Sequence, residues 1–190
     1  GQYVDVLNKA RMNDDVEVVH YATTAMVELQ KDYEAELQRR RQAWEDNRES
    51  RSRSAAYLQT LEAYVDSGLL EGNMKRSRQL ELQELLEYKL HKEDNSEEEE
   101  LSLYHQYFET SLSLEDNETA ASCADHVMEK WPQMENGYMM HIRLGIACRQ
   151  RDRISRMLAL IRERNIYLTP DARKTVEFWK DDNGRQNGMA

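Results

Sequence analysis

The sequence is poor in the residues that interrupt helices. It has only seven glycines and two prolines in 190 residues, so few positions favour a break in a helix. No apolar run approaches the roughly 20 residues that span a bilayer, and no signal peptide is recognisable. The two cysteines, Cys123 and Cys148, are too few for a disulfide framework and lie in apolar helical patterns, which favours a reducing compartment. We therefore expect a helical core that needs neither disulfides nor metal.

Charged residues make up 33% of the chain, and helix formers such as Glu, Leu, Arg, Gln and Ala are abundant. Apolar residues still recur periodically, which indicates ordered amphipathic helices rather than a disordered polyelectrolyte. Thirty-six acidic residues against 26 basic ones give a formal charge of −10. Because this charge repels a phosphate backbone, we expect no nucleic-acid partner.

The stretch DDVEVVHYATTAMVELQ, residues 14–30, has a helical apolar stripe of Val16, Val19, Ala22, Ala25, Met26 and Leu29. A short helix from Tyr3 to about Arg11 should precede it, with residues 13–15 breaking the first helix and capping the second. Tyr33, Leu37 and Trp44 extend the stripe, so the second helix should reach roughly 30 residues. We interpret the stripe as a packing face for neighbouring helices.

Helix-length segments alternate with short turns after residue 50. Ser96 and Glu99 fit a capping box, and Asn117 is expected to cap a later helix. Helix pairs repeated every 35 to 50 residues predict an α-solenoid. In the best-matched pair, which ends at Pro132, Tyr104, Ala120 and Ala124 fit a tetratricopeptide pattern, whereas Phe108 replaces its usual glycine or alanine; the next pair has the expected Leu144-Gly145.

The predicted fold is all-α, a solenoid of degenerate tetratricopeptide-like or HEAT-like helix pairs with a long N-terminal helix. Residues 1–50 would form a HEAT-like pair, residues 51–180 tetratricopeptide-like repeats and residues 181–190 a disordered tail.

Catalytic and ligand-binding motifs receive little support from the sequence. Cys123, His126, His141 and Cys148 could in principle bind zinc, but packing at helix crossings is the favoured interpretation. The acidic run of residues 93–100 lacks calcium-loop spacing and suits a helix start. Glycine-rich nucleotide loops and a hydrolase nucleophile elbow are missing. We expect no enzyme activity, catalytic residue, cofactor or metal.

Arginines and tyrosines are the candidate partner contacts. One cluster, Arg39 to Arg53, brackets the polar link near residue 50. In residues 135–165 seven arginines face three carboxylates, a formal charge of +4, which is either a solvated face or a surface for an acidic protein partner. Tyrosines add amphipathic contact area, although in solenoids they often fill joints between repeats. The predicted partner-binding residues are Arg143, Arg149, Arg151, Arg153, Arg156, Tyr104, Tyr107 and Tyr138.

The segment HYATTAMVELQKDYEAELQ, the turn YVDSGLLEGN and the degenerate repeats behind them resemble the PelE family. This family is the tetratricopeptide-containing inner-membrane component of the Pel exopolysaccharide system of Gram-negative bacteria. The resemblance spans most of the chain and implies a non-catalytic scaffold at the cytoplasmic face of the inner membrane. It implies as partners PelD, a cyclic-di-GMP receptor, the membrane protein PelG and the glycosyltransferase PelF.

The resemblance also implies that membrane segments tether the full-length protein, and the start of the chain at Gly1-Gln2 without a methionine agrees with this. Two other functions stay open: a general cytosolic helical-repeat adaptor, and a helical enzyme or ligand-binding regulator with a pocket inside the solenoid.

Overall fold

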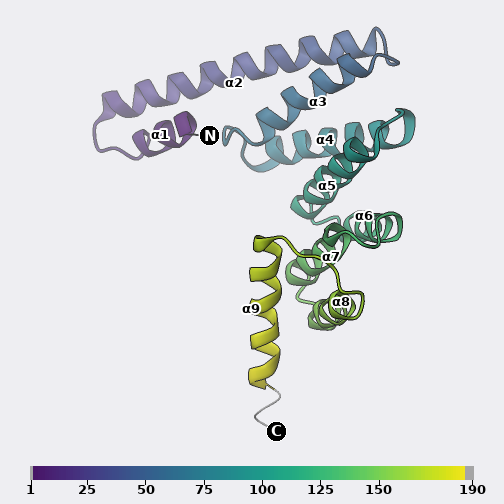
Figure 1. Ribbon diagram of the computed structural model, residues 1–190. Helices are drawn as coiled ribbons and strands as arrows, with labels where there is room; N and C mark the ends of the chain where they lie inside the picture. Colours follow the sequence, from purple (N-terminus) through teal and green to yellow (C-terminus); the bar gives the residue numbers. More distant parts are fainter. Residues whose placement is uncertain (1, 187–190) are drawn as a thin grey trace. The chain divides into compact units, whose positions relative to one another are not determined.

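The computed structural model describes the backbone of residues 2–186 and the side chains of residues 4–179 (Figure 1). Over this range it has nine α-helices and no strand, and within each part of the chain the helices pack chiefly against their sequence neighbours. These features confirm the predicted all-α solenoid. The chain divides into two compact units, residues 1–94 (unit 1) and 95–190 (unit 2). The division expected after residue 50 falls inside unit 1.

Unit 1 contains α1 (Gln2–Ala10), α2 (Val16–Glu45), α3 (Arg51–Val65) and α4 (Gly72–Lys92). The 30-residue α2 has the expected length, and the Asp15 side chain caps it by accepting a hydrogen bond from the Glu17 N–H at 2.9 Å. Both α2 and α4 pack on α3, so α3 lies between them in this unit.

The apolar stripe predicted to be the packing face of α2 is buried only in part. Ala22 and Met26 are buried as expected, but Val16 is 80% exposed. At about 100° per residue, Val16 lies about 120° around the helix axis from Ala22 and about 80° from Met26. It therefore falls outside the face of α2 that its neighbours cover.

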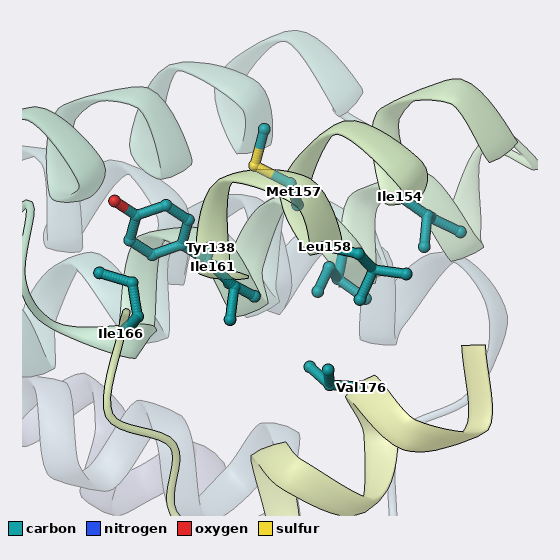
Figure 2. Close-up of a cluster of buried hydrophobic side chains, with 8 residues drawn as sticks. Tyr138, Ile154, Met157, Leu158, Ile161, Ile166 and Val176 are labelled. Carbon is teal, nitrogen blue, oxygen red and sulfur yellow. The ribbon is translucent and has the colours of Figure 1, made fainter. Parts of the chain in front are cut away.

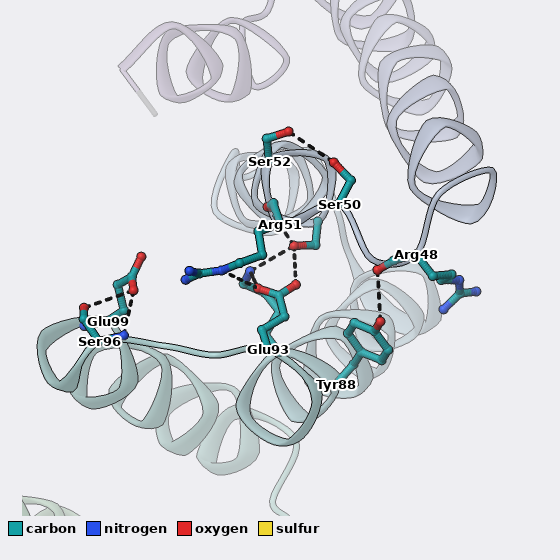
Figure 3. Close-up of polar contacts among 10 residues, drawn as sticks. Arg48, Ser50, Arg51, Ser52, Tyr88, Glu93, Ser96 and Glu99 are labelled. Atoms are coloured by element: carbon teal, nitrogen blue, oxygen red, sulfur yellow. Dashed lines mark hydrogen bonds and ion pairs between the residues drawn. The ribbon is translucent and has the colours of Figure 1, made fainter.

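The core of unit 1 contains two kinds of contact. Leu61, Tyr64 and Leu86 are fully buried, and the ring of Tyr64 stacks on that of Tyr33 with centroids 5.0 Å apart. A buried polar contact joins α3 to α4, because Lys89 Nζ donates to Ser54 Oγ at 3.0 Å and pairs with Glu93 at 2.6 Å. Glu93 is labelled in Figure 3. The pairing offsets the cost of burying these charges.

Unit 2 contains α5 (Glu97–Ser113), α6 (Asn117–Lys130), α7 (Glu135–Ala147), α8 (Arg151–Glu163) and α9 (Pro170–Gln186). The predicted capping box of Ser96 and Glu99 is present at the start of α5 (Figure 3). The predicted cap of α6 is wrong by one residue. Asp116 caps this helix through its contact with the Thr119 N–H at 3.1 Å, and Asn117 is the first helical residue.

Two apolar clusters hold unit 2 together. One joins α5, α6 and α7 around Phe108, Val127 and Leu144. The other joins α7 and α8 to Val176 of α9 (Figure 2). Phe108, which departs from the tetratricopeptide pattern, is fully buried in the first cluster. The packing of α5, α6 and α7 therefore accommodates a phenylalanine side chain at a position where the tetratricopeptide pattern has glycine or alanine.

Three helices of unit 2 end in the same way. Glu115, Arg149 and Asn165 follow the last residues of α5, α7 and α8 with positive φ values of 61°, 55° and 52°. After each of them, the next N–H donates to a carbonyl five residues back, as in Gln150 N–H to Gly145 O at 2.7 Å. This is the Schellman closure of a helix C-terminus, and its recurrence fits a repeat-like architecture.

Part of the tail expected at residues 181–190 is helical in the structure. Residues 181–186 belong to α9, which runs to Gln186, because residues 171–186 contain no proline and only one glycine to end the helix. Residues 187–190 of the expected tail lie outside the described residues. None of the described helices combines the length and apolar character needed to cross a bilayer.

Candidate functional site

Tyr138 cannot contact a partner, contrary to the prediction. Its side chain is fully buried in the α7–α8 cluster (Figure 2). The hydroxyl donates to Pro132 O at 2.9 Å and accepts from Arg164 Nη1 at 2.9 Å. The sequence showed an apolar helix position but not that both hydroxyl partners lie within the same unit. Tyr138 is therefore a core residue.

Tyr104 and Tyr107 are half-buried and pack against the α5–α7 cluster. The Tyr104 ring stacks on His126 with centroids 4.4 Å apart, and burial raises the pKa of its hydroxyl. Both tyrosines thus serve helix packing and leave only part of each ring for a partner.

Arg143 lies apart from the other predicted arginines. Its Nη2 pairs with Glu109 Oε2 of α5 at 2.6 Å. Since this carboxylate neutralises its charge locally, Arg143 contributes to joining α5 and α7.

The remaining four predicted arginines are brought together at the turn from α7 to α8. They line an open groove of about 530 Å³, here named the arginine groove, whose lining is Arg149, Gln150, Arg151, Asp152, Arg153 and Arg156. Four positive charges face a single carboxylate in a chain whose formal charge is −10. This groove concentrates the positive charge expected from the sequence.

Arg153 is held in place by a buried histidine. The Nη1 atom of Arg153 lies 3.3 Å from His141 Nδ1, and His141 Nε2 lies 3.1 Å from Asp125 Oδ1. Burial lowers the pKa of His141, Asp125 opposes this shift and Arg153 adds to it. A neutral ring can accept the Arg153 hydrogen bond on Nδ1, so the contact links α6, α7 and α8 to one wall of the groove.

A second open groove, of about 620 Å³, lies in unit 1 between α2 and α4 with Tyr57 of α3 in its lining. It is named the aromatic groove and is lined by Arg41, Trp44, Glu45, Arg48, Tyr57, Ser77, Arg78, Leu80, Glu81, Glu84, Leu85 and Tyr88. Trp44 packs against the rings of Tyr57 and Tyr88, at centroid distances of 5.5 and 5.1 Å. The Arg48 guanidinium lies 3.8 Å from the Trp44 ring centroid, and the Tyr88 hydroxyl donates to the Arg48 carbonyl (Figure 3).

Glu81 organises the charges of the aromatic groove. It accepts hydrogen bonds from Arg41, from the Tyr57 hydroxyl and from Arg78, the last at 2.6 Å. Burial by itself would raise the pKa of Glu81, but these three donors lower it. Burial and the contact with Glu81 raise the pKa of Tyr57. A carboxylate with a lowered pKa is a weak base and a tyrosine with a raised pKa keeps its proton, so the network favours binding over proton transfer.

The aromatic groove was not predicted, although its parts were visible. Arg41 and Trp44 lie on one face of α2 and Arg48 follows in the turn after this helix, whereas Glu81, Leu85 and Tyr88 share one face of α4. Helix periodicity cannot show which of two faces about 40 residues apart pack together. The spacing of these residues indicated the two helix faces separately. They form one groove because α2 and α4 both pack on α3.

The cysteines and histidines considered for zinc lie in different contacts. Cys123 is buried, which raises its pKa to about 12. His126 lies 3.6 Å from Glu100, and His141 contacts Arg153 and Asp125. Among the described residues, no three His, Cys, Asp or Glu side chains are grouped as metal ligands. Core and helix-joining contacts therefore account for these side chains.

The chain matches no protein-family model, no curated protein and no solved structure.

Proposed function

We propose that this protein is a non-catalytic protein–protein interaction scaffold. The observation that carries the proposal is that each compact unit has its own open groove and that the two linings differ. The arginine groove carries excess positive charge, whereas in the aromatic groove three arginines balance three glutamates around a tryptophan and two tyrosines. Grooves of different chemistry suit different partners. Binding two partners to one chain raises their effective concentration for each other.

The resemblance to the PelE family supplies the first partners to test. We propose that the protein organises a Pel synthase complex at the cytoplasmic face of the bacterial inner membrane, tethered there by membrane segments of the full-length protein. PelD, PelG and the glycosyltransferase PelF are the proposed partners. The repeat-like helical architecture is compatible with this proposal.

The test is co-purification of tagged full-length protein with these partners, using one variant for each groove. Arg149→Glu with Arg153→Glu reverses charge in the arginine groove, and Arg48→Glu with Leu80→Glu changes exposed positions of the aromatic groove. Each variant should lose one partner and keep another. If both variants retain every partner, the grooves are not the binding surfaces. If no Pel component co-purifies with the unaltered protein, the Pel assignment is wrong and a general adaptor is the better proposal.

A ligand-binding regulator is the second candidate, and the aromatic groove favours it. Its volume of about 620 Å³ lies within the usual range for small-molecule sites, and aromatic side chains with a few fixed polar groups are typical of them. A panel of mononucleotides and nucleotide sugars can be screened by thermal shift. A saturable rise in melting temperature that Arg48→Glu abolishes would favour this function over the scaffold.

A further inference from the structure

We propose that the arginine groove binds an acidic segment of a partner protein, a short run of Asp and Glu residues in an exposed stretch of chain. This inference rests on the proposed scaffold function and names the chemistry that one of its two grooves recognises.

The arginine groove carries an excess of positive charge. Arg149 and Arg156 are exposed, and neither forms an ion pair within the part of the chain that the structure describes. Asp152 is the single carboxylate in the lining. Arg143 provides the contrast, since Glu109 of the same unit neutralises it. Clustered like charges repel one another, and carboxylates of a partner would relieve this repulsion through charge-assisted hydrogen bonds.

One hydrogen-bond donor of the groove, Arg153, is already held in position. Arg153 is only partly exposed, and the buried His141 ring lies 3.3 Å from its Nη1. Since the guanidinium has five N–H donors, this contact leaves others to face a ligand. A donor already held in place loses less conformational entropy when it binds.

The lining of the groove favours an acidic peptide over a nucleic acid. The groove is lined by four arginines, one glutamine and one aspartate, and no aromatic ring on which a base could stack. The long phosphate backbone of a nucleic acid would also extend beyond the groove over a chain of formal charge −10. A short carboxylate segment can place its charge within the groove alone.

The backbone at Arg149 allows a clean test variant. Its φ of 55° is the left-handed conformation that glycine adopts most easily at this position after a helix. Arg149→Gly should therefore remove a charge while leaving the melting temperature unchanged or higher. Loss of binding by this variant could not be attributed to unfolding.

The experiment measures fluorescence anisotropy of fluorescein-labelled hexaglutamate titrated with the full chain. The unaltered protein should bind hexaglutamate saturably. Binding should weaken as the salt concentration rises from 50 to 200 mM, because salt screens the attraction between the groove arginines and about three or four peptide carboxylates. Arg149→Gly should weaken binding about fivefold and Arg156→Glu about tenfold or more. Arg143→Glu makes the same change in net charge outside the groove, and it should stay within about twofold of the unaltered protein.

Three results would overturn the inference. One is the absence of saturable binding to hexaglutamate. Another is equal weakening by Arg143→Glu and Arg156→Glu, which would show that general attraction rather than the groove holds the peptide. The third is tighter binding of an oligouridine RNA than of hexaglutamate. If partners co-purify but hexaglutamate does not bind, this inference fails while the scaffold proposal stands. If hexaglutamate binds but no protein partner co-purifies, the scaffold proposal fails while the groove is still a site for acidic peptide.

Discussion

At Gly137 the backbones of α6 and α7 come into direct contact. A Cβ atom built at this position would lie 2.6 Å from both Cα and N of Met128. Backbone cannot move aside as a side chain can, so a methyl group here must push the two helices apart.

We predict that Gly137→Ala lowers the free energy of unfolding by about 1–3 kcal/mol, measured by urea denaturation followed by circular dichroism. Gly145→Ala is the matched comparison in the same helix. Its Cβ would meet the Ile154 side chain at 2.8 Å and the Gln150 carbonyl at 3.3 Å, so side-chain adjustment relieves most of the clash and the cost should be smaller. A larger loss for Gly145→Ala would contradict this account of the α6–α7 contact.

His141 predicts a pH dependence of stability. Its folded-state pKa is lowered, chiefly by burial, so below pH 6.5 the unfolded chain binds this proton more readily than the folded chain. The stabilisation from a neutral His141 is therefore complete above pH 6.5 and decreases as the pH falls toward the lowered folded-state value.

Urea denaturation at pH 7.5 and pH 5.5 measures this contribution. The loss of stability between the two should be smaller in His141→Gln, which cannot take up the proton. His20→Gln changes an exposed histidine and should preserve the loss. Equal losses in His141→Gln and the unaltered protein would assign the pH dependence to other groups.

At the scale of the helix, the cap of α5 is the clearest prediction. Ser96 Oγ accepts from the Glu99 N–H at 3.3 Å, and the Glu99 side chain accepts from the Ser96 N–H at 2.9 Å. Ser96→Ala removes the first bond and should lower the unfolding free energy by about 0.5–2 kcal/mol. Ser102→Ala, an exposed position inside the same helix, should change it by less than about 0.5 kcal/mol. Similar effects of both changes would show that the cap contributes little.

The sequence predicted the positions of the helices better than it predicted the exposure of their side chains. The aspartate before Val16 and the unbroken periodicity to Trp44 predicted α2, because caps and breakers act within a few residues. Burial depends on which neighbour covers which face, which is why Val16 was misplaced in the packing stripe. Asp116 and Asn117 are both good capping residues, so the local sequence could not choose between them.

At the scale of the whole chain, each unit has its own buried core. Leu61, Tyr64 and Leu86 are fully buried in unit 1, as are Phe108 and Ile142 in unit 2. We predict that residues 1–94 and 95–190, produced separately, each give a helical circular-dichroism spectrum and a cooperative thermal transition. An unfolded spectrum for either fragment would mean that its core depends on the rest of the chain.

The two grooves show how far sequence reasoning reaches toward function. The arginines at 149, 151, 153 and 156 are close along the chain, so their grouping was predictable. The neutralisation of Arg143 by Glu109 was not, because the two residues meet only through helix packing. Burial of Tyr138 was missed for the same reason, since a tyrosine at a helix position serves a surface or a joint equally well.

The position of Trp44 has a practical consequence. It lies in the lining of the aromatic groove, while the other two tryptophans, Trp131 and Trp179, belong to unit 2. Replacing those two with phenylalanine would leave a single tryptophan, beside the Arg48 guanidinium, that can be excited selectively over the ten tyrosines. Its emission would then report occupancy of this groove without a label, and would separate binding in unit 1 from binding at the arginines of unit 2.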